Sequence, residues 1–154
     1  MSDYVPLRFL VTDIDHTLAD AAWRDPLLGK WEEYYLAGAR DKVVPFVAEI
    51  VRHFHLGGTP VVAVTARPEK WRCQTVNWLY RHRLPIDEIH MRGDDDHRPG
   101  CIVKPELIRQ RFADLSQVVA VLEDRDDCVA EYRKMGLNVL QVVWRGANNI
   151  EWVY

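Results

Sequence analysis

Short apolar runs alternate along the chain with amphipathic segments of helical period. The run Arg8–Thr12 is rich in apolar and β-branched residues, which is typical of a buried strand. From Val44, apolar side chains recur at helical spacing until Gly57 and Gly58, and this glycine pair favours the end of a helix. The same alternation continues to the end of the chain. It predicts further strands at about 60–64, 86–91, 118–122 and 137–144, and further helices at about 69–82, 104–112 and 126–135.

Strands that alternate with helices predict an α/β fold with three layers of Rossmann-like type, in which helices cover both faces of a parallel sheet of about five strands. The segment from Leu18 to about Val43 breaks the pattern, because it mixes aromatic and charged residues without a clean period. We expect a small insertion there, with one or two short helices. No internal repeat or linker rich in Gly, Ser or Pro divides the 154 residues, so we predict a single domain at 1–154.

Composition and charge narrow the classes of function. The chain has 48% hydrophobic and 28% charged residues, which is typical of a globular protein. Its net charge of −3 provides no overall positive field, so a local cluster of basic residues would have to hold any polyanion. No stretch approaches the roughly 20 apolar residues that span a bilayer, and no basic segment precedes a long apolar one at the start. We expect a soluble, cytoplasmic protein with no membrane partner.

The three cysteines argue against a disulfide framework and against a zinc site. Cys73, Cys101 and Cys128 are widely spaced and no CxxC pair accompanies them. The six histidines are scattered as well. We therefore expect reduced cysteines without a catalytic role.

Polar residues follow three of the predicted strands. They are Asp13 and Asp15 after the first strand, Thr65 and Arg67 after the second, and Glu123 and Asp124 after the fourth. Because ligands of such folds bind beyond the carboxyl ends of the strands, these side chains are expected to converge there. Carboxylates that share a small site repel one another unless a cation neutralises them, and sets of oxygen ligands suit Mg²⁺. The acids thus predict a magnesium site.

Asp13 and Asp15 have the spacing of a nucleophile and a proton-transfer group. Residues i and i+2 of an extended segment point to the same side, so both can face one substrate. One aspartate can attack phosphorus to form an aspartyl-phosphate, while the other protonates the leaving alcohol and later activates water. A phosphate monoester also needs cationic and hydrogen-bond-donating partners, and Thr65, Arg67 and Lys104 are available. DxD alone is a weak motif that an acidic turn would also produce.

Four motifs in order resemble those of the haloacid dehalogenase superfamily of phosphotransferases. They are DIDHT at 13–17, VVAVTAR at 61–67, KPE at 104–106 and VLEDRD at 121–126, and the resemblance spans residues 9 to about 143. It implies the following roles: Asp13 as nucleophile and metal ligand, Asp15 as acid/base and as ligand through its backbone carbonyl, Thr65 as phosphate-binding hydroxyl, Thr17 as substrate-binding residue, Lys104 as phosphate-pairing cation, and Asp124 as acidic metal ligand.

Three positions in or near these motifs are less clearly assigned. His16 stands where the superfamily usually has glycine, so either the position tolerates a side chain or His16 contacts the substrate. Glu123 is expected to hold a metal-bound water or Lys104, and Asp127 is near enough to contribute.

The second half resembles more closely the 3′-phosphatase domain of bacteriophage polynucleotide kinase-phosphatase. The likeness lies in RPxKWRxxTVNWL at 67–79, DDHRPGCIVK at 95–104, EDRD at 123–126 and GLNVLQV at 136–142. It implies a substrate contact for Arg98, six positions before Lys104, and a phage or bacterial source. We expect a local phosphate track along the rim, formed by Arg67, Lys70, Arg72, Arg92 and Arg98. No GxxxxGK[ST] loop occurs, so kinase activity is not expected. A separate kinase or ligase partner would supply the phosphorylation or ligation of the end.

The insertion at about 18–43 is too short for the full cap domains of the superfamily, which leaves the site open for a large substrate end. We therefore expect a magnesium-dependent phosphomonoesterase that removes 3′-phosphates from DNA or RNA ends or from nucleotides. The alternatives are a general nucleotide or small-phosphoester phosphatase and a non-catalytic module that binds phosphorylated ends. The helix predicted at about 69–82 carries Val76, Leu79 and Tyr80 on one face. Trp71 and Trp78 are expected to be helix core residues, with stacking on a nucleobase as the alternative.

Overall fold

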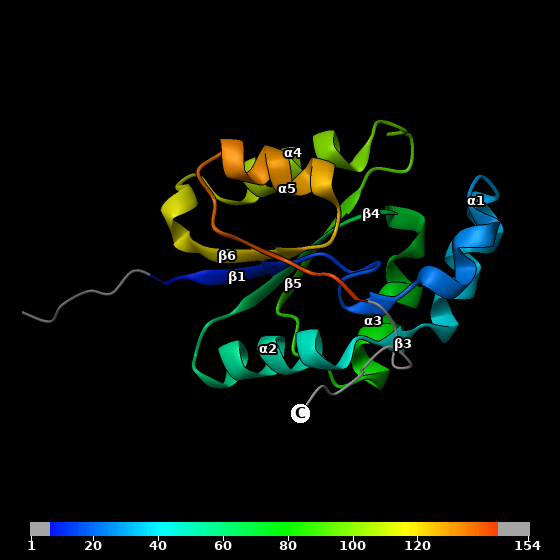
Figure 1. Ribbon diagram of the computed structural model, residues 1–154, viewed down its shortest axis with the longest axis horizontal. Coiled ribbons are helices and arrows are strands. Elements are labelled where there is room, and N and C mark those ends of the chain that lie inside the picture. The colour runs from blue at the N-terminus through cyan, green and yellow to red at the C-terminus, as the bar shows by residue number, and fades with distance from the viewer. Residues whose placement is uncertain (1–6, 145–154) are drawn as a thin grey trace, which may run out of the picture.

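The computed structural model describes residues 7–144 as a five-stranded parallel sheet between two layers of helices (Figure 1). The strand order is β5-β4-β1-β6-β7, and every neighbouring pair is parallel. The predicted α/β fold with about five parallel strands is therefore confirmed. The strands are β1 (Phe9–Thr12), β4 (Val61–Pro68), β5 (Glu88–Arg92), β6 (Val118–Glu123) and β7 (Val139–Gln141), and the main helices are α2 (Pro45–Leu56), α3 (Arg72–Arg81), α4 (Gly100–Arg111) and α5 (Asp126–Lys134).

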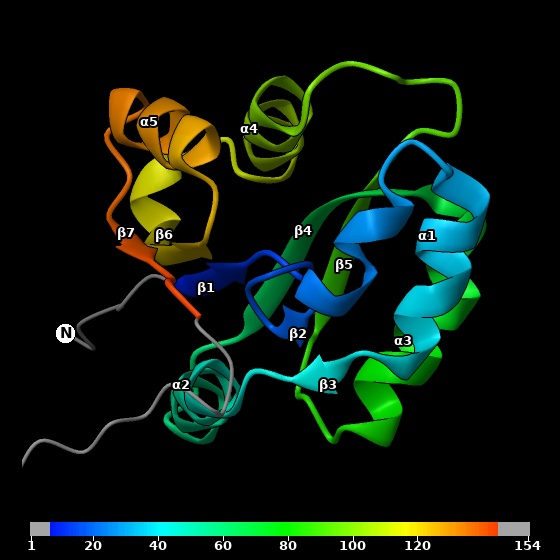
Figure 2. The same cartoon turned by 45° about the vertical axis from the view of Figure 1, so that its right-hand side comes forward.

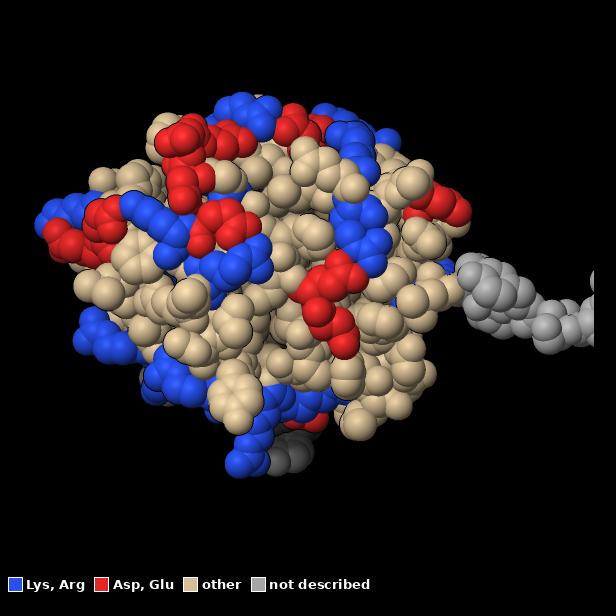
Figure 3. All heavy atoms as spheres, turned by 180° about the vertical axis from the view of Figure 1, so that it is seen from behind, with Lys and Arg blue, Asp and Glu red and all other residues tan. Residues whose placement is uncertain are grey.

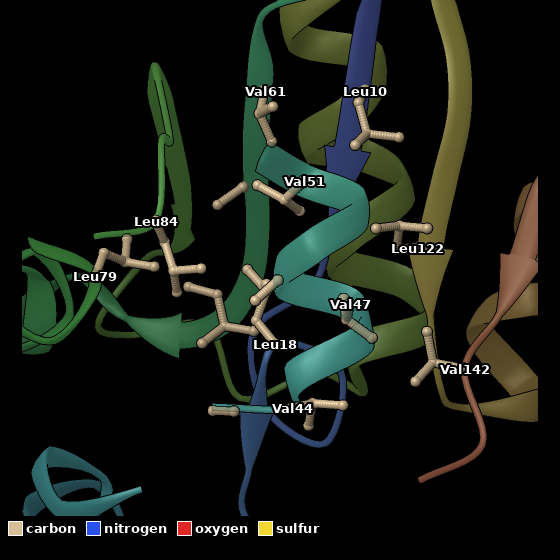
Figure 4. Packing of buried hydrophobic residues seen from close by; sticks show 14 of the residues in the cluster. Leu10, Leu18, Val44, Val47, Val51, Val61, Leu79, Leu84, Leu122 and Val142 are labelled. Atoms are coloured by element: carbon tan, nitrogen blue, oxygen red, sulfur yellow. The ribbon is translucent and has the colours of Figure 1, made fainter. Parts of the chain in front are cut away.

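Strand β1 lies in the middle of the sheet and divides the core in two. Leu10 packs into the cluster beneath α2 and α3, whereas Phe9 and Val11 pack into the cluster beneath α4 and α5. Figure 4 shows Val47 and Val51 of α2 turned toward the sheet on the side of Leu10. Because successive side chains of a strand point to opposite faces, all four residues of β1 are buried. Each fully buried Val or Leu stabilises the fold by about 1.5–3 kcal/mol.

Three examples show where the bounds of elements differ from those predicted. Strand β4 continues to Pro68 instead of ending at Val64, because its pairing with β5 resumes at Pro68 after a register shift. Helix α4 begins at Gly100 rather than at Lys104, since Pro99 already provides an extended backbone before the first turn. Strand β7 is shorter than predicted, because its partner β6 ends at Glu123.

The buried face of α3 also differs from the sequence interpretation. Of the predicted face of Val76, Leu79 and Tyr80, Leu79 is buried, but Val76 is 43% exposed and Tyr80 is 84% exposed. Trp78 is fully buried, and its indole Nε1 donates a hydrogen bond to the carbonyl of Asp41 at 2.9 Å. The large, hydrogen-bonded Trp78 therefore decides which face of α3 meets the core.

Residues 19–43, called the insertion below, lie beyond the sheet on the side where β1 and β4 end (Figures 1 and 2). Strands β2 (Ala19–Asp20) and β3 (Lys42–Val43) pair antiparallel and close its base. Between them lie helix α1 (Trp31–Ala37) and two 3₁₀ turns, η1 (Ala22–Leu27) and η2 (Gly38–Arg40). The predicted excursion with short helices is thus present, and the small two-stranded sheet was not predicted.

The three cysteines are free, with Cys128 buried, Cys101 half-buried and Cys73 exposed. Among residues 7–144, no helix combines the length and the apolar character that crossing a bilayer requires.

Candidate active site

A pocket of about 370 Å³ opens beyond the carboxyl ends of β1, β4 and β6. Because parallel strands bring their carboxyl ends to one edge, residues far apart in the sequence meet here. Six predicted site residues line it: Asp13, Asp15, Thr65, Arg92, Lys104 and Asp124. The insertion contributes a further part of the lining: Asp25, Leu28, Trp31, Tyr34 and Tyr35.

Lys104 lies between two carboxylates on the floor of the pocket. Its Nζ is 3.0 Å from Asp13 Oδ2 and donates a hydrogen bond to Glu123 Oε2 at 2.8 Å. All three side chains are buried. Burial raises the pKa of Asp13 to about 7 against the opposing effect of Lys104, and it also raises the pKa of Glu123. One ammonium group therefore leaves the negative charge of the two carboxylates only partly compensated.

The acidic residues of the pocket form a set that fits a divalent cation. Asp13, Glu123 and Asp124 each offer a carboxylate oxygen, and these oxygens lie within 4.8 Å of one another. The pKa of Asp124 is raised by burial and by the nearby charge of Asp13. Oxygen ligands with uncompensated negative charge are what Mg²⁺ prefers. Glu123 is already engaged by Lys104, so Asp13 and Asp124 are the carboxylates best placed to bind an ion.

Two guanidinium groups hold the carboxylate of Asp15. Arg67 donates from Nη2 to Oδ1 at 2.6 Å and from Nε to Oδ2 at 3.0 Å, and Arg24 donates to the same Oδ1. Asp41 accepts from Arg24 Nη2 at 2.7 Å and completes the cluster. Burial alone would raise the pKa of Asp15, but Arg67 and Arg24 hold it well below its usual range. Asp15 is therefore an oriented, ionised carboxylate.

The sequence analysis missed Arg24 and Asp41. Their side chains are 0% and 2% exposed, and Trp23 Nε1 donates a further hydrogen bond to Asp41 at 2.9 Å. Both arise in the insertion, where no period or motif marks them. The one usable signal was chemical, because an aspartate held ionised near other acids needs basic partners.

Three residues predicted to bind substrate are outside the pocket lining, and one of them, Arg67, is paired with Asp15. Thr17 is buried, and its hydroxyl donates to Asp124 Oδ1 at 3.0 Å, so it lies behind the candidate metal ligand. Arg98 is exposed and pairs with Asp96 at 2.8 Å and with Glu106 at 2.7 Å. Their contact with substrate stays a prediction.

Most side chains of the predicted phosphate track are paired with carboxylates. Lys70 contacts Glu32, and Arg72 Nη2 lies 2.6 Å from Glu69 Oε1. On the face drawn in Figure 3, basic and acidic side chains likewise lie interspersed. Of the five predicted residues of the track, Arg92 is the one that lines the pocket.

His16 also lines the pocket and has a left-handed backbone with φ 61°. Glycine adopts this conformation without a steric penalty, which explains the usual preference at this position. The imidazole Nε2 lies 3.1 Å from Asp25 Oδ1 of the insertion. His16 is thus accommodated by turning toward the insertion.

The family and the solved structures that match this chain agree with the geometry of the site. Residues 8–146 match the family model described as the polynucleotide kinase PNKP phosphatase domain, which confirms the resemblance inferred from the motifs. Among the matching solved structures, the Pnkp1/Rnl/Hen1 complex has 26% identity and a TM-score of 0.78, with 91% of this chain and 47% of that chain covered. The Pnkp1/Rnl/Hen1 RNA repair complex has 25% identity and a TM-score of 0.80, with 91% and 43% covered.

Two further matches are a solved structure and a curated relative. A putative phosphatase from Clostridium difficile has 16% identity and a TM-score of 0.67 over 90% of this chain and 86% of its own, a likeness in fold alone. Membrane-associated phosphatidylinositol transfer protein 3 from Homo sapiens is 26% identical over 110 residues, which cover 70% of this chain and 11% of that protein. This chain therefore spans about a tenth of that curated relative and less than half of the repair-complex chains.

Proposed function

This chain belongs to the polynucleotide kinase PNKP phosphatase domain family, and from that premise we propose that it is a magnesium-dependent phosphomonoesterase that removes 3′-phosphates from polynucleotide ends or nucleotides. Phosphatase activity itself agrees with the family and with the haloacid dehalogenase-type neighbours. The observation that carries the mechanism is the contact of Lys104 with Asp13 in a pocket that Thr65 and Asp124 also line.

In the first half-reaction, the Asp13 carboxylate attacks phosphorus. A bond forms between Asp13 Oδ and phosphorus, the bond between phosphorus and the 3′ oxygen breaks, and Asp15 gives a proton to the departing alcohol. Thr65 and Lys104 hold the phosphate oxygens. In the second half-reaction, water attacks phosphorus and gives its proton to Asp15, so that Asp13 is released as a carboxylate and inorganic phosphate leaves.

The arginine pair explains how Asp15 can serve both half-reactions. Arg24 and Arg67 favour the ionised carboxylate, which suits the acceptance of a proton from water. When a phosphate dianion enters, its negative charge disfavours a second anion beside it, and this repulsion favours a protonated Asp15 for the first half-reaction.

Magnesium would be held by the carboxylates of Asp13 and Asp124 and by the backbone carbonyl of Asp15. Once bound, it compensates the negative charge of the phosphate and of the acids around it. Thr17 keeps Asp124 in place through its hydrogen bond, and Lys104 keeps Glu123 away from the ion through its own.

The insertion acts in this proposal as a small cap on a single domain at 1–154. It lines one side of the pocket and leaves access for the end of a polynucleotide. Because similar chains belong to complexes named Pnkp1/Rnl/Hen1, we also propose that separate kinase or ligase proteins complete the repair of an end that this chain has dephosphorylated.

The direct test offers the purified protein magnesium and matched DNA and RNA oligonucleotides with a 3′-phosphate or a 5′-phosphate. Phosphate release from the 3′ end alone, lost in Asp13→Asn, is the expected result. Turnover of p-nitrophenyl phosphate or free nucleotides with neither oligonucleotide would favour a general phosphatase. Binding of the 3′-phosphorylated oligonucleotide without any turnover would favour a non-catalytic module.

A further inference from the structure

A second cleft of about 210 Å³ adjoins the catalytic pocket, and the proposed chemistry does not use it. Trp31 and Tyr35 of α1 and Trp71 from the turn after β4 contribute its aromatic wall, and Pro68 also lines it. We call it the aromatic cleft. Trp31, Tyr35 and Arg92 line both spaces, so the aromatic cleft is continuous with the site that holds Asp13.

The aromatic wall has the geometry of a stacking surface. The rings of Trp31 and Tyr35 are stacked, with centroids 6.1 Å apart and planes 27° apart. Tyr35 and Trp71 are also 6.1 Å apart, with planes at 35°. Trp31 is 53% exposed although it is one of the largest apolar side chains of the insertion. Flat, accessible rings of this kind bind other flat π systems.

Hydrogen-bond donors accompany the rings. The buried Nε1 of Trp71 and Nε of Arg92 have no hydrogen-bond partner among the described residues. Buried donors are almost always satisfied in folded proteins, so these two side chains of the cleft retain hydrogen-bonding capacity that acceptor atoms of a ligand can use once the side chains turn toward it.

The charges around the aromatic cleft disfavour a second phosphate there. Lys70 is paired with Glu32, and its backbone N–H donates to Asp94 Oδ1 at 2.8 Å. Asp96 lines the same cleft and accepts a hydrogen bond from Arg92 Nη1 through its carbonyl at 3.3 Å. With acids and bases offsetting each other, a neutral planar group fits better than an anion.

We propose that the aromatic cleft binds the nucleobase of the nucleotide whose 3′-phosphate lies at Asp13. This assignment rests on the proposed function and adds to it the site that holds the base of the terminal nucleotide. Arg92 stands at the junction of the two spaces, within the lining of both. Stacking on aromatic rings tolerates every base, so the cleft selects a nucleoside without selecting a sequence.

The test measures binding in the Asp13→Asn protein, which cannot consume its ligand. Two fluorescein-labelled oligonucleotides carry a 3′-phosphate and differ only in the terminal nucleotide, which has either a base or an abasic tetrahydrofuran. Fluorescence anisotropy should show that the base strengthens binding about 5- to 150-fold, which corresponds to about 1–3 kcal/mol of stacking. Adding Trp71→Ala should remove most of this preference, whereas Trp71→Phe should keep most of it.

Tyr80→Ala is the matched control, because Tyr80 is an aromatic residue of α3 that is 84% exposed and outside the cleft lining. It should leave the base preference intact. Equal affinity for the two oligonucleotides, or an unchanged preference in Trp71→Ala, would overturn the proposal. A base preference that persists in Trp71→Phe separates the loss of stacking from a loss of folding.

Two further arms separate this proposal from the proposed function. Adenosine 3′-monophosphate against inorganic phosphate repeats the comparison with a free nucleotide. A gain in both ligand pairs, or in the oligonucleotide pair alone, supports the cleft, and the second result assigns it to polynucleotide ends. If the base preference holds while the active protein releases no 3′-phosphate, the reaction is misassigned and the cleft stands. If 3′-phosphate is released without any base preference, the function stands and the cleft falls.

Discussion

Two buried charge clusters meet at the catalytic pocket, and they are built in opposite ways. One comes from strand ends and α4 of the core, and each member lies in a recognisable motif. The other takes half of its members from the insertion. The core cluster consists of Asp13, Lys104 and Glu123, and the insertion cluster consists of Asp15, Arg24, Asp41 and Arg67.

The two clusters differ in charge balance. In the core cluster one ammonium faces two carboxylates, and burial raises the pKa of Asp13 to about 7. In the insertion cluster two guanidinium groups face two carboxylates, and the pKa of Asp15 is held well below its usual range despite burial. A cluster with uncompensated negative charge can bind a cation and provide a nucleophile, whereas a balanced cluster can orient a carboxylate and hold the insertion on the core.

The largest expected effect comes from removing the nucleophile from the core cluster. Asp13→Asn should lower the turnover of a 3′-phosphorylated oligonucleotide by about 10³-fold or more, because no aspartyl-phosphate can form. The Lys104–Glu123 pair remains, so the variant should stay folded by circular dichroism. Asp95→Asn, on the exposed loop after β5, is the control and should keep its activity. Turnover that survives Asp13→Asn would refute the mechanism.

Breaking the balanced cluster should affect stability first. Asp41→Asn leaves two buried guanidinium groups, Arg24 and Arg67, to share the one carboxylate of Asp15, and a broken buried pair costs about 3–5 kcal/mol. Glu123→Gln in the core cluster should cost less, because Lys104 keeps Asp13 as its partner. Urea unfolding of the two variants measures the difference. A larger loss of unfolding free energy for Glu123→Gln than for Asp41→Asn would contradict the charge balance assigned to the two clusters.

The link between Thr17 and Asp124 should tune the metal requirement of the core cluster. Removal of magnesium with EDTA should stop turnover, and excess magnesium should restore it. Thr17→Val keeps the shape of a buried side chain but loses the hydrogen bond to Asp124, so it should need about 10- to 100-fold more magnesium for half-maximal activity. Thr17→Ser should return the requirement toward the original value. An unchanged magnesium curve for Thr17→Val would argue that Asp124 needs no support.

The same contrast explains what the sequence could predict. Strand β1, its terminal aspartates and the end of β6 follow from local patterns, because an apolar run followed by acids marks a strand that ends at a site. Burial of Lys104 against Asp13 follows from motif order in a family with a known arrangement. The main elements were therefore predictable to within a few residues.

The insertion cluster depends on non-local packing, which a single sequence does not display. Arg24 and Asp41 are 17 residues apart in a segment without a period, and charged residues of these types are seldom fully buried. The aromatic rings of the neighbouring cleft come from α1 and from the turn after β4, which no motif connects. The face predicted for α3 is wrong at Val76 and Tyr80 for the same reason, because the hydrogen bond from Trp78 to Asp41 that orients the helix is a non-local contact.

The smallest effect is predicted for a partly exposed ion pair, which serves as a reference for the two buried clusters. Arg111 Nη2 donates to Glu88 Oε1 at 2.6 Å, and the hydrogen bonds with Arg111 and, to a smaller extent, with His90 lower the pKa of Glu88 from its ordinary 4.5 to about 2. A folded-state pKa below the unfolded value means that the pair stabilises the protein fully above pH 4.5 and that this contribution is lost as the pH falls toward 2. Because the Glu88 side chain is 34% exposed, solvent screening limits the effect to about 0.2–1 kcal/mol. Thermal unfolding of the original protein and of Glu88→Gln between pH 6 and pH 2.5 should give curves that differ most at pH 6 and converge with acid. Parallel curves over this range would mean that the Glu88–Arg111 pair contributes nothing measurable to stability. The buried clusters would then differ from this pair in kind, because their ion pairs are shielded from solvent.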